Sequence, residues 1–151
     1  MKKIFLAMAV LFQLGSAYAQ NKSGLLTQYY AVKDALVKGN SATASAAATA
    51  FVKAAGEAAG DKAIEAAKAK LVADAEQIAA TRDLAKQREQ FKQLSADMYA
   101  LAKSTKLSDE PVYQQYCPMK KAGWLSGSKD IKNPYYGNQM LTCGKVADTI
   151  E

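Results

Sequence analysis

The clearest structural pattern in this chain lies in residues 84–101, which have the sequence LAKQREQFKQLSADMYAL. Apolar side chains recur there at helical spacings, at Leu84, Phe91, Leu94, Met98 and Leu101. This spacing places them on one face of an amphipathic helix, with charged and polar residues on the other face. A methionine in such a stripe usually fills the core, so we expect Met98 to be buried.

The segment before this stretch predicts three more helices. Residues 22–105 contain most of the alanines and no proline, a composition that favours helix. Their apolar residues form three further stripes, which contain Tyr29, Phe51 and Leu71. Four amphipathic helices with short links predict an all-α fold, with an up-down four-helix bundle over residues 22–105.

The composition changes near residue 105. Residues 106–151 contain all three prolines, both cysteines and the only tryptophan, together with a cluster of Gly, Asn and Ser. Such residues favour turns and loops. We therefore expect a C-terminal cysteine-containing loop cap on the bundle, and a single domain over residues 22–151.

The N-terminus has the pattern of a secretory signal peptide over residues 1–19. Lys2 and Lys3 precede an apolar run that ends at Leu14, and a small-x-small cleavage site follows at residues 17–19. The run is about half as long as the roughly 20 apolar residues of a spanning helix. We expect a soluble protein exported to the periplasm, an oxidising compartment, with no membrane span after cleavage.

The charge pattern and the absence of histidine exclude several function classes. The chain carries 20 basic and 14 acidic residues, which alternate along the predicted helices as on solvent-exposed helix faces. No basic stripe with interleaved aromatic residues is present, so we do not expect nucleic acid as a partner. Without histidine there is no Ser-His or Cys-His nucleophile pair and no imidazole metal site. We therefore predict that the protein is not an enzyme.

Two sulfur pairs stand out in the C-terminal region. Cys117-x-Met119 and Met140-x-x-Cys143 bracket a loop rich in turn-forming residues. Closure of that loop would bring two thiols and two thioethers towards one place. Thiolate and thioether ligands favour Cu(I) over hard cations. These four residues are therefore a candidate Cu(I) site.

The two cysteines also have a second interpretation. In an oxidising compartment, Cys117 and Cys143 would form a structural disulfide when no metal protects them. Closing a loop of about 27 residues would stabilise the fold by roughly 3.5 kcal/mol. A disulfide consumes the thiolates that a metal needs, so the two states exclude each other. Thiol–disulfide catalysis is a third interpretation, although it normally uses a close Cys-x-x-Cys pair.

Three aromatic residues of this region, Trp124, Tyr135 and Tyr136, allow two interpretations as well. Packed against the end of the bundle, they would bury a large area beneath the loops. Exposed, they would form a surface for a partner protein. The residues Asn133-Pro134 and Gly137 beside them are typical of turns.

Six segments of the chain support a comparison with a known family. They are Gln115–Met119, Trp124–Ser126, Ile131–Gly137 and Met140–Gly144 in the C-terminal region, and Tyr29–Val37 and Arg88–Ser95 in the predicted helices. These segments closely resemble the bacterial exported domain family of unknown function numbered 3347. The resemblance covers nearly the whole chain after the predicted signal peptide. Similar domains occur attached to periplasmic adaptor subunits of heavy-metal efflux systems and near copper-handling proteins.

The resemblance agrees with the interpretation of the sulfur residues. We predict a periplasmic Cu(I)-binding protein that associates with an efflux adaptor or another copper-handling envelope protein. Its predicted ligands are Cys117, Met119, Met140 and Cys143.

The alternative is a non-catalytic, disulfide-stapled interaction module of the cell envelope, which docks through Trp124, Tyr135 and Tyr136. Lys120 and Lys121 depart from the small residue expected after Cys-Pro-Met in many relatives. They make the rim of the site more positive, which is expected to disfavour a cation there.

Overall fold

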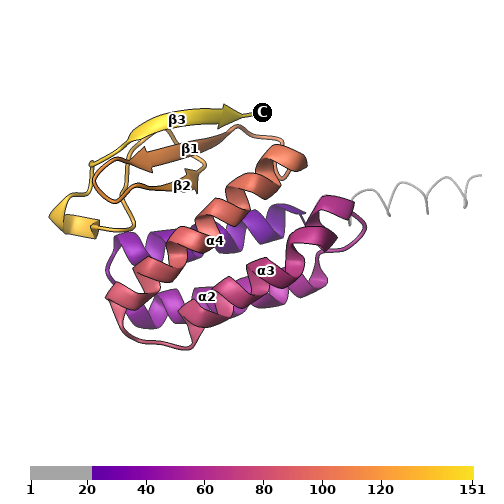
Figure 1. Ribbon diagram of the computed structural model, residues 1–151, viewed down its shortest axis with the longest axis horizontal. Helices are drawn as coiled ribbons and strands as arrows, with labels where there is room; N and C mark the ends of the chain where they lie inside the picture. The colour runs from indigo at the N-terminus through magenta and orange to yellow at the C-terminus, as the bar shows by residue number, and fades with distance from the viewer. Residues whose placement is uncertain (1–21) are drawn as a thin grey trace, which may run out of the picture.

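The computed structural model describes residues 22–151, which contain four helices and a three-stranded antiparallel sheet (Figure 1). The helices cover residues 22–37, α2 Ser41–Glu57, α3 Lys62–Ala79 and α4 Leu84–Ser104. The strands are β1 Val112–Cys117, β2 Ala122–Ser126 and β3 Lys145–Ile150, with a short 3-10 helix η1 at Gly137–Gln139. The all-α prediction is therefore wrong, because the fold is mixed α/β. The predicted signal peptide, residues 1–19, lies outside the described residues.

Each of the last three helices begins at a side chain that accepts backbone hydrogen bonds. Asn40 accepts from Thr43 N–H before α2, and Asp61 accepts from two N–H groups at the start of α3. Asp83 accepts from two N–H groups at the start of α4. These contacts satisfy N–H groups that have no partner within the first turn. They explain why α3 and α4 start where they do in an otherwise continuous alanine-rich stretch.

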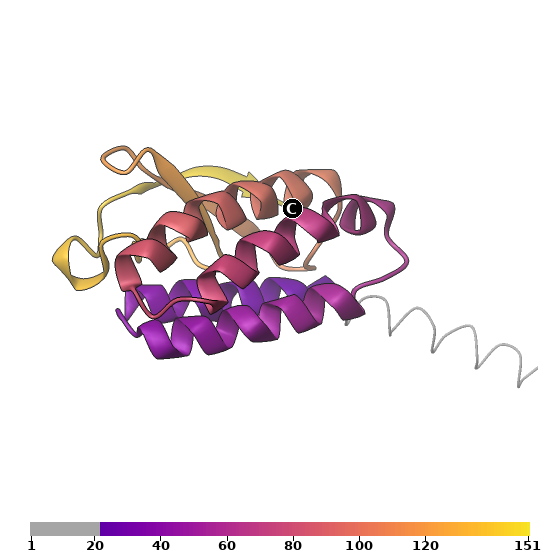
Figure 2. The ribbon, with the colours of Figure 1, turned by 60° about the horizontal axis from the view of Figure 1, so that its bottom comes forward.

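Successive helices alternate in direction (Figure 2). Their apolar stripes are buried in the core between them. Phe91, Leu94, Met98 and Leu101 of the predicted α4 stripe are buried in the core, whereas Leu84 at the start of the helix is half-buried. Tyr29 of the first helix stacks on Phe91 of α4, with ring centroids 5.3 Å apart. Tyr29 also bonds Ser95 through its hydroxyl at 2.8 Å, and Ser95 lies on the same helix as Phe91. This part of the prediction is confirmed, because local periodicity determines the helix faces.

The predicted loop cap contains the sheet, in the strand order β2-β1-β3. The sheet lies on α4, on the side away from α2 and α3 (Figure 1). Val112 at the start of β1 pairs with Ile150 near the C-terminus, and the register shifts once between Gln114 and Gln115. The sheet thus unites segments more than thirty residues apart, and its pairing brings the cysteine region against the helices.

The two faces of the sheet have different neighbours. Gln115 pairs with Trp124 and Cys117 with Ala122, so these side chains share one face, since side chains alternate along a strand. The loop between β2 and β3 covers this face, because the Tyr135 ring lies 6.0 Å from Trp124. The opposite face carries Gln114 and Tyr116 and looks towards α4. In the part of the chain that the structure describes, no helix is long and apolar enough to span a membrane.

Candidate functional site

The structure brings the two cysteines together. Cys117 is the last residue of β1 and is buried, whereas Cys143 lies in the turn before β3 and is half-buried. Because β3 pairs with β1, the two Sγ atoms lie 3.2 Å apart. Both cysteines carry free thiols in this structure, since a disulfide would bring the sulfurs to about 2.05 Å.

The Cys117 sulfur lies in a ring of hydrogen-bond donors. Burial raises its pKa, but four hydrogen bonds together lower it by more. They come from the N–H groups of Lys120 and Met119, the Cys143 thiol and the Asn133 side chain. The net result is a pKa of the Cys117 thiol below its ordinary value. The pKa of Cys143 is raised, chiefly by its hydrogen bond to Cys117. Cys117 is therefore the more acidic thiol of the pair, and Cys143 the less acidic one.

Asn133 fixes the position of Cys143 relative to β1. Its side chain is fully buried and donates to the carbonyl oxygen of Cys143 at 2.7 Å. Its Oδ1 accepts hydrogen bonds from the N–H groups of Tyr135 and Tyr136, at 2.8 and 3.2 Å. The sequence predicts only a turn at Asn133, because a buried structural asparagine and a surface turn asparagine look alike in one sequence.

The two methionines differ in their surroundings. Met119 lies in the turn after β1, and 63% of it is exposed. Met140 is half-buried, and its carbonyl accepts the N–H of Cys143 at 3.1 Å. Within residues 22–151, no three His, Cys, Asp or Glu side chains gather so that they could hold an ion. A third protein ligand beside the two thiols would therefore come from a methionine.

A comparison with protein-family models matches residues 25–110 to a protein of unknown function (DUF3347). The chain belongs to this family. The match covers the helices and ends just before β1, so the cysteine turns lie beyond it, although the motifs quoted for the resemblance extend to Gly144. No curated protein and no solved structure matches the chain.

In this DUF3347 chain the predicted aromatic surface is mostly interior. Trp124 is 1% exposed, and its indole N–H donates to Gln115 Oε1 at 2.7 Å. Tyr135 is 3% exposed and donates to the carbonyl oxygen of Gly123 at 2.6 Å. Tyr136 is half-buried, with the ammonium group of Lys120 5.0 Å from its ring. Of the three residues, Tyr136 alone offers substantial surface to a partner.

Gln115 is a further structural residue that sequence reasoning missed. It is fully buried, accepts from Trp124, and donates through Nε2 to the carbonyl oxygens of Ser128 and Asp130, at 2.9 and 3.1 Å. It thereby connects the tryptophan to the loop that follows β2. A glutamine in a polar stretch gives no signal of burial, since its environment depends on pairing with a distant strand.

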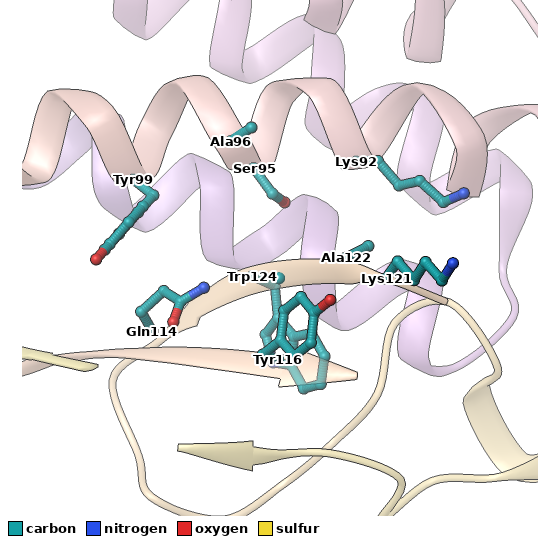
Figure 3. Close-up of a pocket in the computed structure, with 10 residues that line it drawn as sticks. Lys92, Ser95, Ala96, Tyr99, Gln114, Tyr116, Lys121, Ala122 and Trp124 are labelled. Carbon is teal, nitrogen blue, oxygen red and sulfur yellow. The ribbon is translucent and has the colours of Figure 1, made fainter. Parts of the chain in front are cut away.

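A cleft separates α4 from the α4-facing side of β1 and β2 (Figure 3). It has a volume of about 240 Å³ and contains side chains from both layers, among them Lys92, Ser95, Tyr99, Gln114, Tyr116 and Lys121. Gly123 leaves room for the Gln114 side chain at the cleft. A Cβ at position 123 would lie only 2.5 Å from Gln114 Nε2. The cleft lies beside the turn that follows Cys117.

Proposed function

We propose that this protein is an exported Cu(I)-binding protein that takes part in copper or heavy-metal handling. The observation that carries the proposal is the pair of thiols 3.2 Å apart, with Cys117 held in a ring of N–H donors. A thiolate is the form of cysteine that ligates a metal. The protein therefore supplies one thiol that loses its proton more readily than usual and a second thiol at contact distance.

The donor set favours a soft monovalent ion. Cys117 and Cys143 are the proposed thiolate ligands, and soft sulfur ligands select Cu(I). Met140 is the preferred thioether, because it is half-buried and its carbonyl is bonded to the Cys143 backbone. Met119 is the second candidate, on the exposed turn. The chain contains no histidine, so the imidazole ligands of common zinc and copper(II) sites are absent.

The lysines beside the site suit a bound Cu(I) better than they suit a free cation. Two thiolates and one Cu(I) together carry one negative charge. Lys120 and Lys121 follow Cys117 by three and four residues, and Lys120 also donates its N–H to the sulfur. Positive charge and N–H donors stabilise the anionic complex. The departure from a small residue noted in the sequence is thus consistent with a metal site.

The cellular role is inferred from the sequence. The basic and apolar pattern of residues 1–19 is that of an export signal, which would deliver the protein to the periplasm. Resemblance to domains attached to heavy-metal efflux adaptors suggests such an adaptor, or another copper-handling envelope protein, as partner. In this role the protein binds copper and carries out no reaction.

A second candidate function rests on the same contact between the sulfurs. In an oxidising compartment with no copper present, two thiols at 3.2 Å would be oxidised to a disulfide. The protein would then be a stapled interaction module. Because Trp124 and Tyr135 are buried, its docking surface would have to centre on Tyr136 and the exposed turn residues.

A competition titration distinguishes the two candidates. The reduced protein is titrated anaerobically into the coloured Cu(I) complex of bicinchoninate, and loss of colour reports transfer of copper. We expect one Cu(I) per chain and loss of transfer in Cys117→Ser and in Cys143→Ser. Met140→Leu should weaken binding more than Met119→Leu, which serves as the matched thioether variant. Unchanged transfer in the double cysteine variant would reject the metal site.

A further inference from the structure

The cleft between α4 and the sheet has two ammonium groups at one end. Lys92 of α4 and Lys121 of the β1–β2 turn direct their side chains to the same end of the cleft (Figure 3). Lys92 pairs with Glu89 at 2.8 Å, but that carboxylate is 66% exposed and belongs to the same helix surface. In the described part of the chain, the Lys121 side chain forms no hydrogen bond or ion pair. Glu89 balances part of the charge of Lys92, so the excess positive charge at this end of the cleft comes chiefly from Lys121.

The backbone at Lys121 adds a second observation. Its φ is +50°, and no other non-glycine residue among residues 22–151 has a positive φ. A side chain in the left-handed region costs roughly 1 kcal/mol relative to glycine. The turn itself requires only the hydrogen bond from Lys121 N–H to the Pro118 carbonyl, which glycine could form equally well. The lysine therefore has a structural cost that no contact within the described chain offsets.

The rest of the cleft offers apolar walls and unused polar groups. Ala96 of α4 lines it from one layer, and Tyr116 of β1, with its aromatic ring, lines it from the other (Figure 3). The Tyr116 hydroxyl and the Gln114 amide have no hydrogen-bond partner within residues 22–151. The Tyr99 hydroxyl, by contrast, already has a partner, since it donates to the Asp148 carboxylate at 2.7 Å. The arrangement is a short apolar slot with cations at one end and free polar groups along it.

We propose that this cleft binds a small organic anion. Its acidic group, a carboxylate or a phosphate, would pair with Lys92 and Lys121. Its apolar or aromatic part would lie between Ala96 and the ring of Tyr116, and a polar substituent would reach the Gln114 amide or the Tyr116 hydroxyl. The volume of 240 Å³ limits the ligand to a small molecule. This proposal does not depend on copper binding, because none of the cleft residues named is a proposed copper ligand.

Three probes separate charge from apolar contact. Benzoate combines an acidic group with a ring, benzamide has nearly the same shape without charge, and inorganic phosphate has charge without a ring. Each is titrated into isotopically labelled reduced protein at low ionic strength, and backbone amide shifts are followed by NMR. We expect saturable shifts for benzoate at residues 92–99, 114–116 and 121–124. Benzamide and phosphate should each bind at least tenfold more weakly.

Two pairs of variants locate the site. Lys121→Gln removes one charge–anion contact and should weaken benzoate binding about tenfold, whereas Lys53→Gln, on the distant helix α2, should leave it unchanged. Ala96→Leu should block the slot, whereas Ala100→Leu, one turn further along α4, should not. Both alanines are exposed helix positions, so these variants should fold. Circular dichroism and the amide spectrum check folding directly.

The titrations and the variants can each overturn the proposal. No saturable benzoate shift, or shifts centred away from the cleft, would overturn it. Equal binding of benzoate and benzamide would reject the role of the lysines, and equal binding of phosphate would reject the apolar slot. Benzoate binding that survives both Lys121→Gln and Ala96→Leu unchanged would also overturn it. Tighter binding of benzoate than of phosphate supports an organic acid over free phosphate as the ligand of the cleft.

Discussion

The Asn133 side chain donates a hydrogen bond to the carbonyl oxygen of Cys143 at 2.7 Å, from a fully buried position. The same amide accepts two N–H groups from the following turn and donates to the sulfur of Cys117. One side chain therefore determines where Cys143 lies, shapes the turn beside it and favours the thiolate of Cys117. The separation of the two sulfurs depends on Asn133 as much as on the pairing of the strands.

Asn133→Ala should therefore affect both stability and thiol geometry. Two N–H groups and one carbonyl lose their partner in the interior, so we expect the free energy of unfolding to fall by about 2–4 kcal/mol. Urea denaturation measures this loss. A trivalent arsenical that bridges two nearby thiols should also bind the folded variant more weakly. Asn138→Ala, an exposed asparagine of the same loop, is the matched control, and equal behaviour of the two variants would contradict the role given to Asn133.

Two glycines should respond to alanine in opposite directions. Gly137 has φ +54°, and a Cβ there would lie 2.7 Å from Arg88 Nη2 and 2.8 Å from the Val37 carbonyl oxygen. We expect Gly137→Ala to lower the free energy of unfolding by about 2 kcal/mol or more. Gly56 lies in α2 with nothing within 4 Å of its added Cβ. Gly56→Ala should raise stability by roughly 0.5–1 kcal/mol. Thermal unfolding of the two variants tests the pair.

Asp74 should make the stability depend on pH. Burial and the neighbouring Asp97 raise the pKa of its carboxyl to about 6, whereas the unfolded value is 3.8. Between about pH 4 and pH 6 the folded protein thus holds a proton that the unfolded chain releases. The free energy of unfolding should fall as pH rises through this window and remain lower above it.

Asp74→Asn removes this dependence, because the amide stays neutral. We expect the variant to be about 1–2 kcal/mol more stable than the wild type at pH 7.5, and similar to it at pH 4.5. Burial raises the pKa of Asp97, but the hydrogen bond from Lys70 at 2.6 Å outweighs it, so this pKa is lowered while that of Asp74 is raised. Urea unfolding at the two pH values is the measurement, with exposed Asp109→Asn as control. A wild-type stability that is flat or rises over this range would contradict the assignment.

The helices could be predicted from the sequence because their signal is local. The spacing of Phe91, Leu94 and Met98 determines a helix face whatever packs on it, and these residues are buried. The sheet could not be predicted in the same way. β1 is rich in Tyr and Gln, and β3 is largely exposed, so neither shows a regular apolar alternation. What stabilises them is pairing between segments distant in the chain, such as Val112 with Ile150.

The residues of the candidate site also differ in whether the sequence could predict them. Cys117 and Cys143 could be selected from residue type and compartment, and their roles as metal ligands stay a prediction. Asn133 and Gln115 could not be selected, because nothing local distinguishes a buried amide from a solvated one. Nothing local in the sequence signals the positive φ of Lys121, and the cleft beside it exists only because the sheet lies on α4.

Mass spectrometry of the protein purified from the periplasm without reductant tests the central claim most directly. Thiols are alkylated before and after Cu(I) is offered under anaerobic conditions. The account predicts two alkylatable thiols, both protected when one copper ion adds to the intact mass. A chain that has lost two hydrogens to a Cys117–Cys143 disulfide and takes up no copper even after reduction would contradict it.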